Sequence, residues 1–114
     1  MRGTPDPAQL DRLFFALSDA SRRNMLERLS AGPTSVTALG QPLGIAMSSV
    51  VKHLAVLENG GLVESDKSGR VRTYRIAPNA FAAMEKWVAL RKTHLNAQFD
   101  NLDAFLTSKK LKGD

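Results

Sequence analysis

The chain has 114 residues, carries a formal net charge of +5 and contains no cysteine. This length fits one domain and is short for a catalytic cleft between two domains, and the lack of cysteine excludes disulfide bonds and thiolate metal sites. The basic balance favours a polyanionic partner, either nucleic acid or an anionic membrane surface, although simple solubility would also explain it.

The sequence shows no sign of export, membrane insertion or catalysis. No segment is long and apolar enough to cross a bilayer, and residues 1–9 lack the apolar run of a signal peptide. We therefore expect a cytoplasmic protein with no membrane partner. No phosphate-cradling glycine loop and no arrangement of serine, histidine and acid is found, so we expect neither an enzyme nor a cofactor nor a metal site.

The first predicted helix begins at about residue 7. Asp6 is suited to cap it and Pro7 to occupy its first position. Phe15 lies off the apolar face of this helix, which indicates either a second surface to be covered or an ordinary exposed aromatic residue. Residues 1–6 are expected to form a flexible tail. The residues of the apolar face are Leu10, Leu13, Phe14 and Leu17.

Three further helices are predicted before residue 60. Asp19 and Ser35 are suited to cap the second and third. The fourth is expected over about residues 47–59, because Gly60-Gly61 follows it. The residues expected to face the core are Met25, Leu26, Leu29, Val36, Leu39, Val50, Leu54 and Leu57.

Two short β-capable runs follow, at residues 62–66 and 71–76, and the turn between them contains glycine. This pattern predicts a β-hairpin. Tyr74 and Ile76 share a face, because side chains alternate along a strand, and both are expected to point inward.

The last predicted helix spans about residues 79–106, with Asn79 as its cap. About 28 helical residues are about 42 Å long, so part of this helix should meet another chain or lie exposed. Residues 107–114 are expected to form a flexible basic tail. Arg91 and Gln98 interrupt one row of an otherwise heptad-like pattern, whose members are Phe81, Met84, Val88, Leu95, Leu102 and Phe105.

Residues 35–59 have the pattern of a helix-turn-helix, since a short helix and a longer one are joined only by residues 44–46. In such a unit the second helix enters the major groove of DNA with its N-terminal residues at the base edges. Met47 and Val51 could meet thymine methyl groups, but a helical wheel puts both near the buried side, so we expect them to pack in the core. The residues expected to contact DNA are Ser48, Ser49, Lys52 and His53, whose side chains suit base edges or phosphates.

The predicted hairpin carries four basic residues and no acidic one between residues 67 and 75. A charge run usually marks a solvated face, but this one tops a hairpin that directly follows the expected groove-binding helix. Such a wing can lay cations on the phosphates or in the minor groove. We therefore expect Lys67, Arg70 and Arg72 to contact DNA, while one of Arg72 and Arg75 could instead pair with Glu64 or Asp66 across the strands.

Together these segments resemble the arsenic-repressor-type (ArsR-like) winged helix-turn-helix regulators over residues 10 to about 106. The resemblance rests on FALSDASRR (15–23), LGI (43–45), VVKHLAVLE (50–58), GLV (61–63) and GRVRTYRI (69–76). It implies a mainly α fold of about five helices plus a two-stranded wing, in a single domain over residues 7–106. It further implies a homodimer on an operator in double-stranded DNA, usually a repressor.

The resemblance places the dimer interface on the first and last helices, at about residues 7–18 and 79–106. This agrees with the exposed position expected for Phe15 and with the heptad-like last helix. The residues expected at the interface are Leu10, Phe14, Phe15, Val88, Leu95, Leu102 and Phe105.

The chain departs from this family at its regulatory positions. The metal sensors of the family carry a cysteine-containing motif on the third helix, where this chain reads VTALGQ (36–41), and the last helix lacks the metal ligands of some members. We therefore expect no metal response through cysteine sites. The inducing signal is left open as a small-molecule effector, a protein partner or none. Ala46, Met47 and Val51 replace frequent polar residues, so relatives do not predict the operator.

Two functions of different classes remain open at this point. The first is a dimeric DNA-binding regulator on a near-palindromic operator, with two recognition helices in major grooves about 34 Å apart. The second is a winged-helix module for protein–protein assembly, in which the basic wing is incidental. A small hydrolase or enzyme subunit is disfavoured for want of a catalytic constellation.

Overall fold

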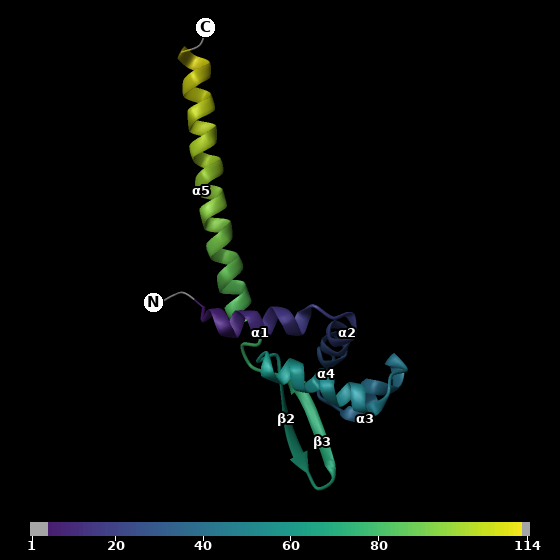
Figure 1. The fold of residues 1–114 in the computed structure, drawn as a ribbon. Helices are drawn as coiled ribbons and strands as arrows, with labels where there is room; N and C mark the ends of the chain where they lie inside the picture. The colour runs from purple at the N-terminus through teal and green to yellow at the C-terminus, as the bar shows by residue number, and fades with distance from the viewer. Residues whose placement is uncertain (1–4, 113–114) are drawn as a thin grey trace.

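The computed structural model describes residues 5–112, with side chains up to Lys109. Figure 1 shows α1 to α4 gathered above the hairpin, while α5 projects from the other side of this group. The predicted mainly α fold with a two-stranded wing, formed by β2 and β3, is confirmed. The elements are α1 (Pro7–Leu17), α2 (Ala20–Leu29), β1 (Thr34–Ser35), α3 (Val36–Gly40), the 3-10 helix η1 (Gln41–Leu43), α4 (Met47–Asn59), β2 (Val63–Ser68), β3 (Val71–Ile76) and α5 (Ala82–Lys112).

Side-chain caps set where α1, α2 and α3 begin. Asp6, Asp19 and Ser35 accept hydrogen bonds of 3.2, 3.0 and 3.3 Å from backbone N–H groups in the first turn of their helices. Each of the three residues has the extended backbone that an N-cap requires. The predicted caps are therefore confirmed, as is Pro7 at the start of α1.

One hydrophobic core lies among α1 to α4 and the base of the wing. Residues 50, 54 and 57 are fully buried, so one side of α4 faces this core and the other side is left free. Neighbouring elements cover that buried side, which fixes the rotation of α4 about its own axis. The largest fully buried side chains are Leu13, Met25, Leu39, Val50, Leu54, Leu57 and Leu62.

β3 lies between β1 and β2 and runs antiparallel to both. Ser68 pairs with Val71, so only Gly69 and Arg70 close the wing. The φ of Gly69 is +61°, which a two-residue hairpin turn of this kind requires and which glycine adopts without a steric cost. Tyr74 is buried and Ile76 is half-buried, which confirms their predicted inward face.

α5 differs from its prediction at both ends. Asn79 has a φ of +59° and is not an N-cap, because a capping residue is extended. Its carbonyl accepts a 3.1 Å hydrogen bond from the N–H of Ala82, where the helix begins. Residues 107–112, where a flexible tail was expected, are helical, so α5 extends beyond its predicted end at about residue 106. Residues 1–4 and 113–114, also expected as tails, lie outside the described residues.

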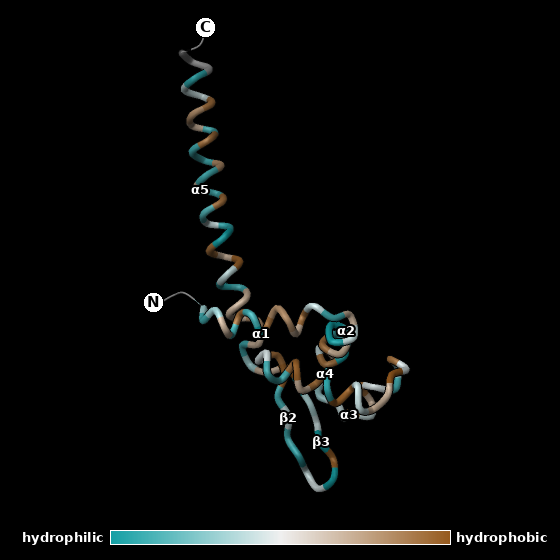
Figure 2. Tube along the Cα trace, viewed as in Figure 1, coloured by the Kyte–Doolittle hydropathy of each residue, from teal (hydrophilic) through white to brown (hydrophobic). Residues whose placement is uncertain are grey.

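The length of α5 dominates the shape of the molecule. The principal extents are 76 × 32 × 22 Å and the radius of gyration is 20.9 Å, whereas a compact domain of this size would have about 13 Å. Every described side chain from Arg91 onward is exposed, and Figure 2 shows polar and apolar segments alternating along this projecting part. No helix among residues 5–112 is long and apolar enough to cross a membrane.

Candidate nucleic-acid interface

α3, η1 and α4 form the helix-turn-helix predicted from the sequence. α3 passes directly into η1, and Gly44 then takes a φ of +63°. A left-handed residue reverses the chain direction at the end of a helix, and glycine does so without a clash of its own. α4 begins at Met47, so the connection between η1 and α4 is three residues long, as expected.

The N-terminal half of α4 presents a row of exposed side chains, which we name the recognition ridge: Met47, Ser48, Val51 and Lys52. Ser49 beside it is half-buried. The expectation that Met47 and Val51 pack in the core is wrong, because they are 46% and 51% exposed. Neighbouring elements cover only the side of α4 that carries residues 50, 54 and 57. The ridge therefore combines a hydroxyl, a cation and two apolar side chains.

His53 lies inside the edge of the ridge and is held by α2. Nη1 of the buried Arg22 lies 3.3 Å from Nδ1 of His53, and a carboxylate oxygen of Asp19 lies 3.9 Å from the same atom. The guanidinium of Arg22 also donates to the carbonyls of Phe15 and Ala16 at the end of α1, at 2.9 and 2.7 Å. His53 thus ties α4 to the α1–α2 junction and offers DNA little surface; its contact with DNA stays a prediction.

The same junction also changes the pKa of the Asp19 carboxylate. The pKa of Asp19 is lowered, first because the carboxylate accepts a hydrogen bond from the N–H of Arg22, and further by the positive charge of the Arg22 side chain. Partial burial opposes this shift. The ionised form of Asp19 is therefore the one that the folded chain favours.

The two faces of the wing differ in charge. Lys67 and Arg72 lie opposite each other on the face that also carries Tyr74. On the other face Arg75 forms ion pairs with Asp66 and, at 2.9 Å, with Glu64. The hydrogen bond to Asp66, and then that to Glu64, raise the pKa of Arg75 above its usual value. The predicted cross-strand pair is thus confirmed for Arg75, whose charge is neutralised.

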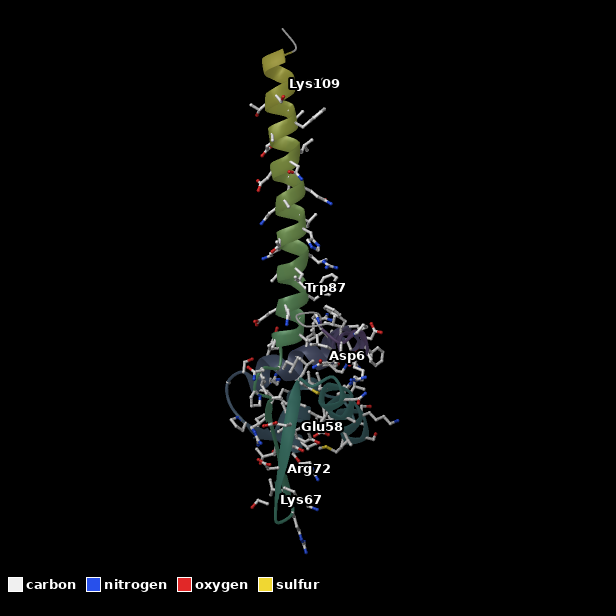
Figure 3. All side chains as sticks on the ribbon, turned by 90° about the vertical axis from the view of Figure 1, so that its left-hand side faces the viewer. Asp6, Glu58, Lys67, Arg72, Trp87 and Lys109 are labelled. Carbon is white, nitrogen blue, oxygen red and sulfur yellow. The ribbon has the colours of Figure 1, made fainter. Side chains whose placement is uncertain are left out.

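The tip of the wing keeps its positive charge. Arg70 is exposed there, and in the described part of the chain no carboxylate oxygen lies within 4.0 Å of Arg70, Lys67 or Lys52. Arg72 donates to the hydroxyl of Ser65 at 2.9 Å. Figure 3 shows Lys67 and Arg72 on the wing, at the end of the molecule opposite Lys109. These exposed cations are available to a polyanion.

The residues expected at a dimer interface differ in the surface that they offer. Leu10 is buried within the chain and Val88 is half-buried, so both offer a second copy little surface. Phe14 is exposed but contacts Trp87 of α5 edge-on, with ring centroids 5.9 Å apart. The remaining members of the set, which are 49–61% exposed, are Phe15, Leu95, Leu102 and Phe105.

Two residues that position α4 were not found from the sequence. A Cβ atom at Gly40 would lie 2.6 Å from a methyl carbon of Val50, so α3 approaches α4 at a distance that only glycine allows. A glycine inside a predicted helix is a signal for such close packing. Arg22 had no comparable signal, because its partner His53 lies 31 positions away. No group of three or more potential metal ligands occurs among residues 5–112.

Known proteins share this architecture. A family described as a helix-turn-helix domain matches residues 17–66. The HTH-type transcriptional regulator Rv2034 of Mycobacterium tuberculosis is 38% identical over 74 residues, which cover 65% of this chain and 69% of that protein. The crystal structure of the ArsR family transcriptional regulator RHA00566 has a TM-score of 0.77 and 40% identity, covering 82% of this chain and 96% of that chain.

A second solved structure adds information about assembly. The homodimeric winged helix-turn-helix DNA-binding domain Mb0332 of Mycobacterium bovis has a TM-score of 0.62 and 29% identity, covering 85% of this chain and 95% of that chain. These relatives and this fold are those of DNA-binding transcriptional regulators and not of enzymes. The present chain carries the helix-turn-helix, the wing and no cysteine. It therefore belongs to the ArsR family of winged helix-turn-helix transcriptional regulators and lacks the cysteines of that family's metal sensors.

Proposed function

We propose that this chain acts as a homodimeric repressor that binds a near-palindromic operator in double-stranded DNA. The observation that carries this proposal is the exposed recognition ridge of α4 next to a wing whose tip cations are not neutralised. Ser48, Ser49 and Lys52 would read base edges, with Met47 and Val51 against thymine methyl groups. Arg70 and Lys67 would hold the wing on the phosphates or in the minor groove, and Arg72 would assist them.

The start of α4 supports this docking. The cap position is Ala46, which has no side-chain hydrogen bond to offer, so the first N–H groups of α4 have no capping acceptor. Such groups at a helix N-terminus bind phosphate oxygens well, because the helix dipole adds to their attraction. The first turn of α4 can therefore anchor the recognition ridge on the DNA backbone.

The dimer would be formed by α1 and α5. Phe15, Leu95, Leu102 and Phe105 are exposed apolar residues on these helices, and the relative Mb0332 is homodimeric. A two-fold axis would place the two recognition ridges in successive major grooves, about 34 Å apart, which is why the operator should be nearly palindromic.

Repression would follow from occupancy, because a dimer bound over a promoter excludes the transcription machinery. Release would depend on a signal other than a metal bound by thiolates, since the chain has no cysteine. A small-molecule effector and a protein partner are the two classes of signal to be tested.

The experiment is a fluorescence anisotropy titration with duplex DNA from upstream of the chain's own gene. We expect binding at least about 1,000-fold tighter than to a shuffled duplex of the same composition, with a steep salt dependence. Equal affinity for both duplexes would contradict the proposal and favour a module for protein–protein assembly.

A further inference from the structure

A hollow with a volume of about 400 Å³ lies between α1 and the first turns of α5. Figure 3 shows Trp87, which borders it, near the end of α5 that joins the rest of the molecule. The volume falls within the range of small-molecule sites, about 300–1,000 Å³, which combine apolar walls with a few polar groups that orient the ligand. The lining has this combination, with the apolar side chains of Leu10, Phe14, Trp87 and Leu90 and the charged side chains of Asp11 and Arg91.

Two aromatic rings form a corner of the hollow. The ring centroids of Phe14 and Trp87 lie 5.9 Å apart and the ring planes meet at 76°. The two residues are 40% and 38% exposed, so neither ring is covered by the rest of the described chain. A third ring in such a corner can stack on one ring and meet the other edge-on, and both arrangements are favourable. The corner therefore favours an aromatic ligand.

Arg91 is held in place beside this corner. The central carbon of its guanidinium lies 5.5 Å from the centroid of the Trp87 ring, which is within the range of a cation–π contact. In the described part of the chain no carboxylate oxygen lies within 4.0 Å of Arg91. A guanidinium that is already oriented loses little entropy when it binds a carboxylate through two hydrogen bonds. Arg91 therefore favours a ligand with a carboxylate group.

Asp11 supplies the second charge of the hollow. It is exposed and, like Arg91, has no ion-pair partner within 4.0 Å among the residues described. Its carboxylate repels the acid group of a ligand but accepts a hydrogen bond from a hydroxyl group. A ligand that satisfies both side chains therefore places its carboxylate at Arg91 and a hydroxyl group at Asp11.

We propose that this hollow binds a small aromatic acid that carries a hydroxyl group, and that this ligand is the inducer that releases the chain from DNA. The inference rests on the proposed function and assigns the class of signal that was left open there. The ring of the ligand lies in the corner of Phe14 and Trp87, its carboxylate on Arg91 and its hydroxyl group on Asp11.

α1 connects the hollow to the recognition ridge. The carbonyls of Phe15 and Ala16, at the end of α1, accept hydrogen bonds of 2.9 and 2.7 Å from Arg22. Nη1 of Arg22 lies 3.3 Å from Nδ1 of His53 on α4. The other wall of the hollow is α5, which belongs to the proposed dimer interface. A ligand that changes the angle between α1 and α5 therefore moves α4 relative to the second copy, and with it the spacing of the two recognition ridges.

The fluorescence of Trp87 reports binding in the hollow without a label, because the chain has one tryptophan. The probes are 4-hydroxyphenylacetate, its amide and tyramine, which share a phenol ring and differ in the charge at the other end. We expect the acid to change the fluorescence with a dissociation constant below about 1 mM and to bind at least about 10-fold tighter than the amide or the amine. No change with the acid, or equal affinity for the amine, would overturn the inference.

Two variants test the roles of the charged side chains. Arg91→Gln should weaken binding of the acid at least about 10-fold. Lys92→Gln is the matched control, because it removes the same charge from the next exposed residue, which does not line the hollow, and it should change the affinity about 2-fold or less. Asp11→Asn should weaken 4-hydroxyphenylacetate about 5-fold but not phenylacetate, which lacks the hydroxyl group. Equal losses in Arg91→Gln and Lys92→Gln, or the same loss for both acids in Asp11→Asn, would contradict these roles.

Operator binding separates this inference from the proposed function. Saturating 4-hydroxyphenylacetate should weaken operator binding about 10-fold in anisotropy, and the operator should weaken binding of the acid by the same factor. Binding of the acid that leaves operator affinity unchanged would overturn its role as inducer. If the chain prefers its operator but the acid does not bind, the inducer site is wrong and the proposed function stands. If the acid binds but the chain does not prefer its operator, the hollow is a ligand site and the proposed function is wrong.

Discussion

Arg70 at the tip of the wing is the residue whose removal should most clearly change the salt dependence of DNA binding. No carboxylate oxygen of the described chain lies within 4.0 Å of it, so its full charge is available to a phosphate. One phosphate contact contributes about 0.9 to the slope of log K against log salt concentration, so Arg70→Ala should lower the slope of a dimer by about 1.8. This loss corresponds to about 60-fold weaker binding at about 0.1 M salt and about 9-fold at about 0.3 M.

The assay is anisotropy of a labelled operator duplex at four salt concentrations. Lys109→Ala is the matched control, because it removes the same charge from the end of the molecule opposite the wing (Figure 3), and its slope should equal that of the wild type. Arg70→Ala should weaken binding to operator and shuffled duplex by the same factor, since phosphate contacts do not read sequence. An unchanged slope, or a loss confined to the operator, would show that the wing does not lie on the phosphate backbone.

Three further changes test other parts of the site. Ser49→Val should alter the ranking of single-base-pair operator variants by about 10-fold while changing the mean affinity less, which competition anisotropy measures; a uniform loss over all variants would refute base reading by this residue. Gly40→Ala puts a Cβ atom 2.6 Å from a methyl carbon of Val50, so the free energy of unfolding in urea should fall by about 1–3 kcal/mol, and an unchanged urea midpoint would refute the close approach of α3 and α4. The lowered pKa of Asp19 means that its carboxylate stabilises the fold above the usual value of 3.8, and that this gain is lost as the pH falls through the lower folded pKa. The free energy of unfolding of the wild type should therefore drop more steeply below about pH 4 than that of Asp19→Asn. If the two chains lose stability identically with falling pH, the Asp19 carboxylate does not stabilise the fold.

The helix starts and the buried face of α4 were predictable because their signals are local. An N-cap such as Asp19 acts on N–H groups within three residues, and a helical repeat such as Val50, Leu54 and Leu57 is visible within one segment. The wing was predictable for the same reason, since two short strands flank a glycine turn.

The predictions from the sequence failed where one residue type suits two local structures. They also failed where neighbouring elements decide whether a residue is buried or belongs to a strand. Asn79 is a good N-cap but also tolerates the left-handed conformation, which it takes here. The helical wheel located the buried side of α4 but not its width, and so misplaced Met47 and Val51. β1 has only two residues and no period of its own, so only its pairing with β3 defines it.

The sequence predicted which basic residues lie on the wing, but not which of their charges is neutralised by an ion pair. Lys67 and Arg70 were recognised from their place in the hairpin. Which of Arg72 and Arg75 is neutralised depended on strand register, because the register puts Arg75 opposite Glu64. A shift by one residue would have exchanged the two faces of the wing and their charges.

The most direct measurement is cleavage of operator DNA by an iron chelate attached to α4. Ala55 is exposed on α4 beyond the recognition ridge, and the thiol introduced by Ala55→Cys would be the only one in the chain. If each copy of a dimer lays α4 in a major groove, cleavage should fall in two clusters about 10 base pairs apart, related by the symmetry of the operator. A single cluster, or diffuse cleavage equal to that from a chelate attached through Lys109→Cys, would contradict the docking of two recognition helices in successive grooves.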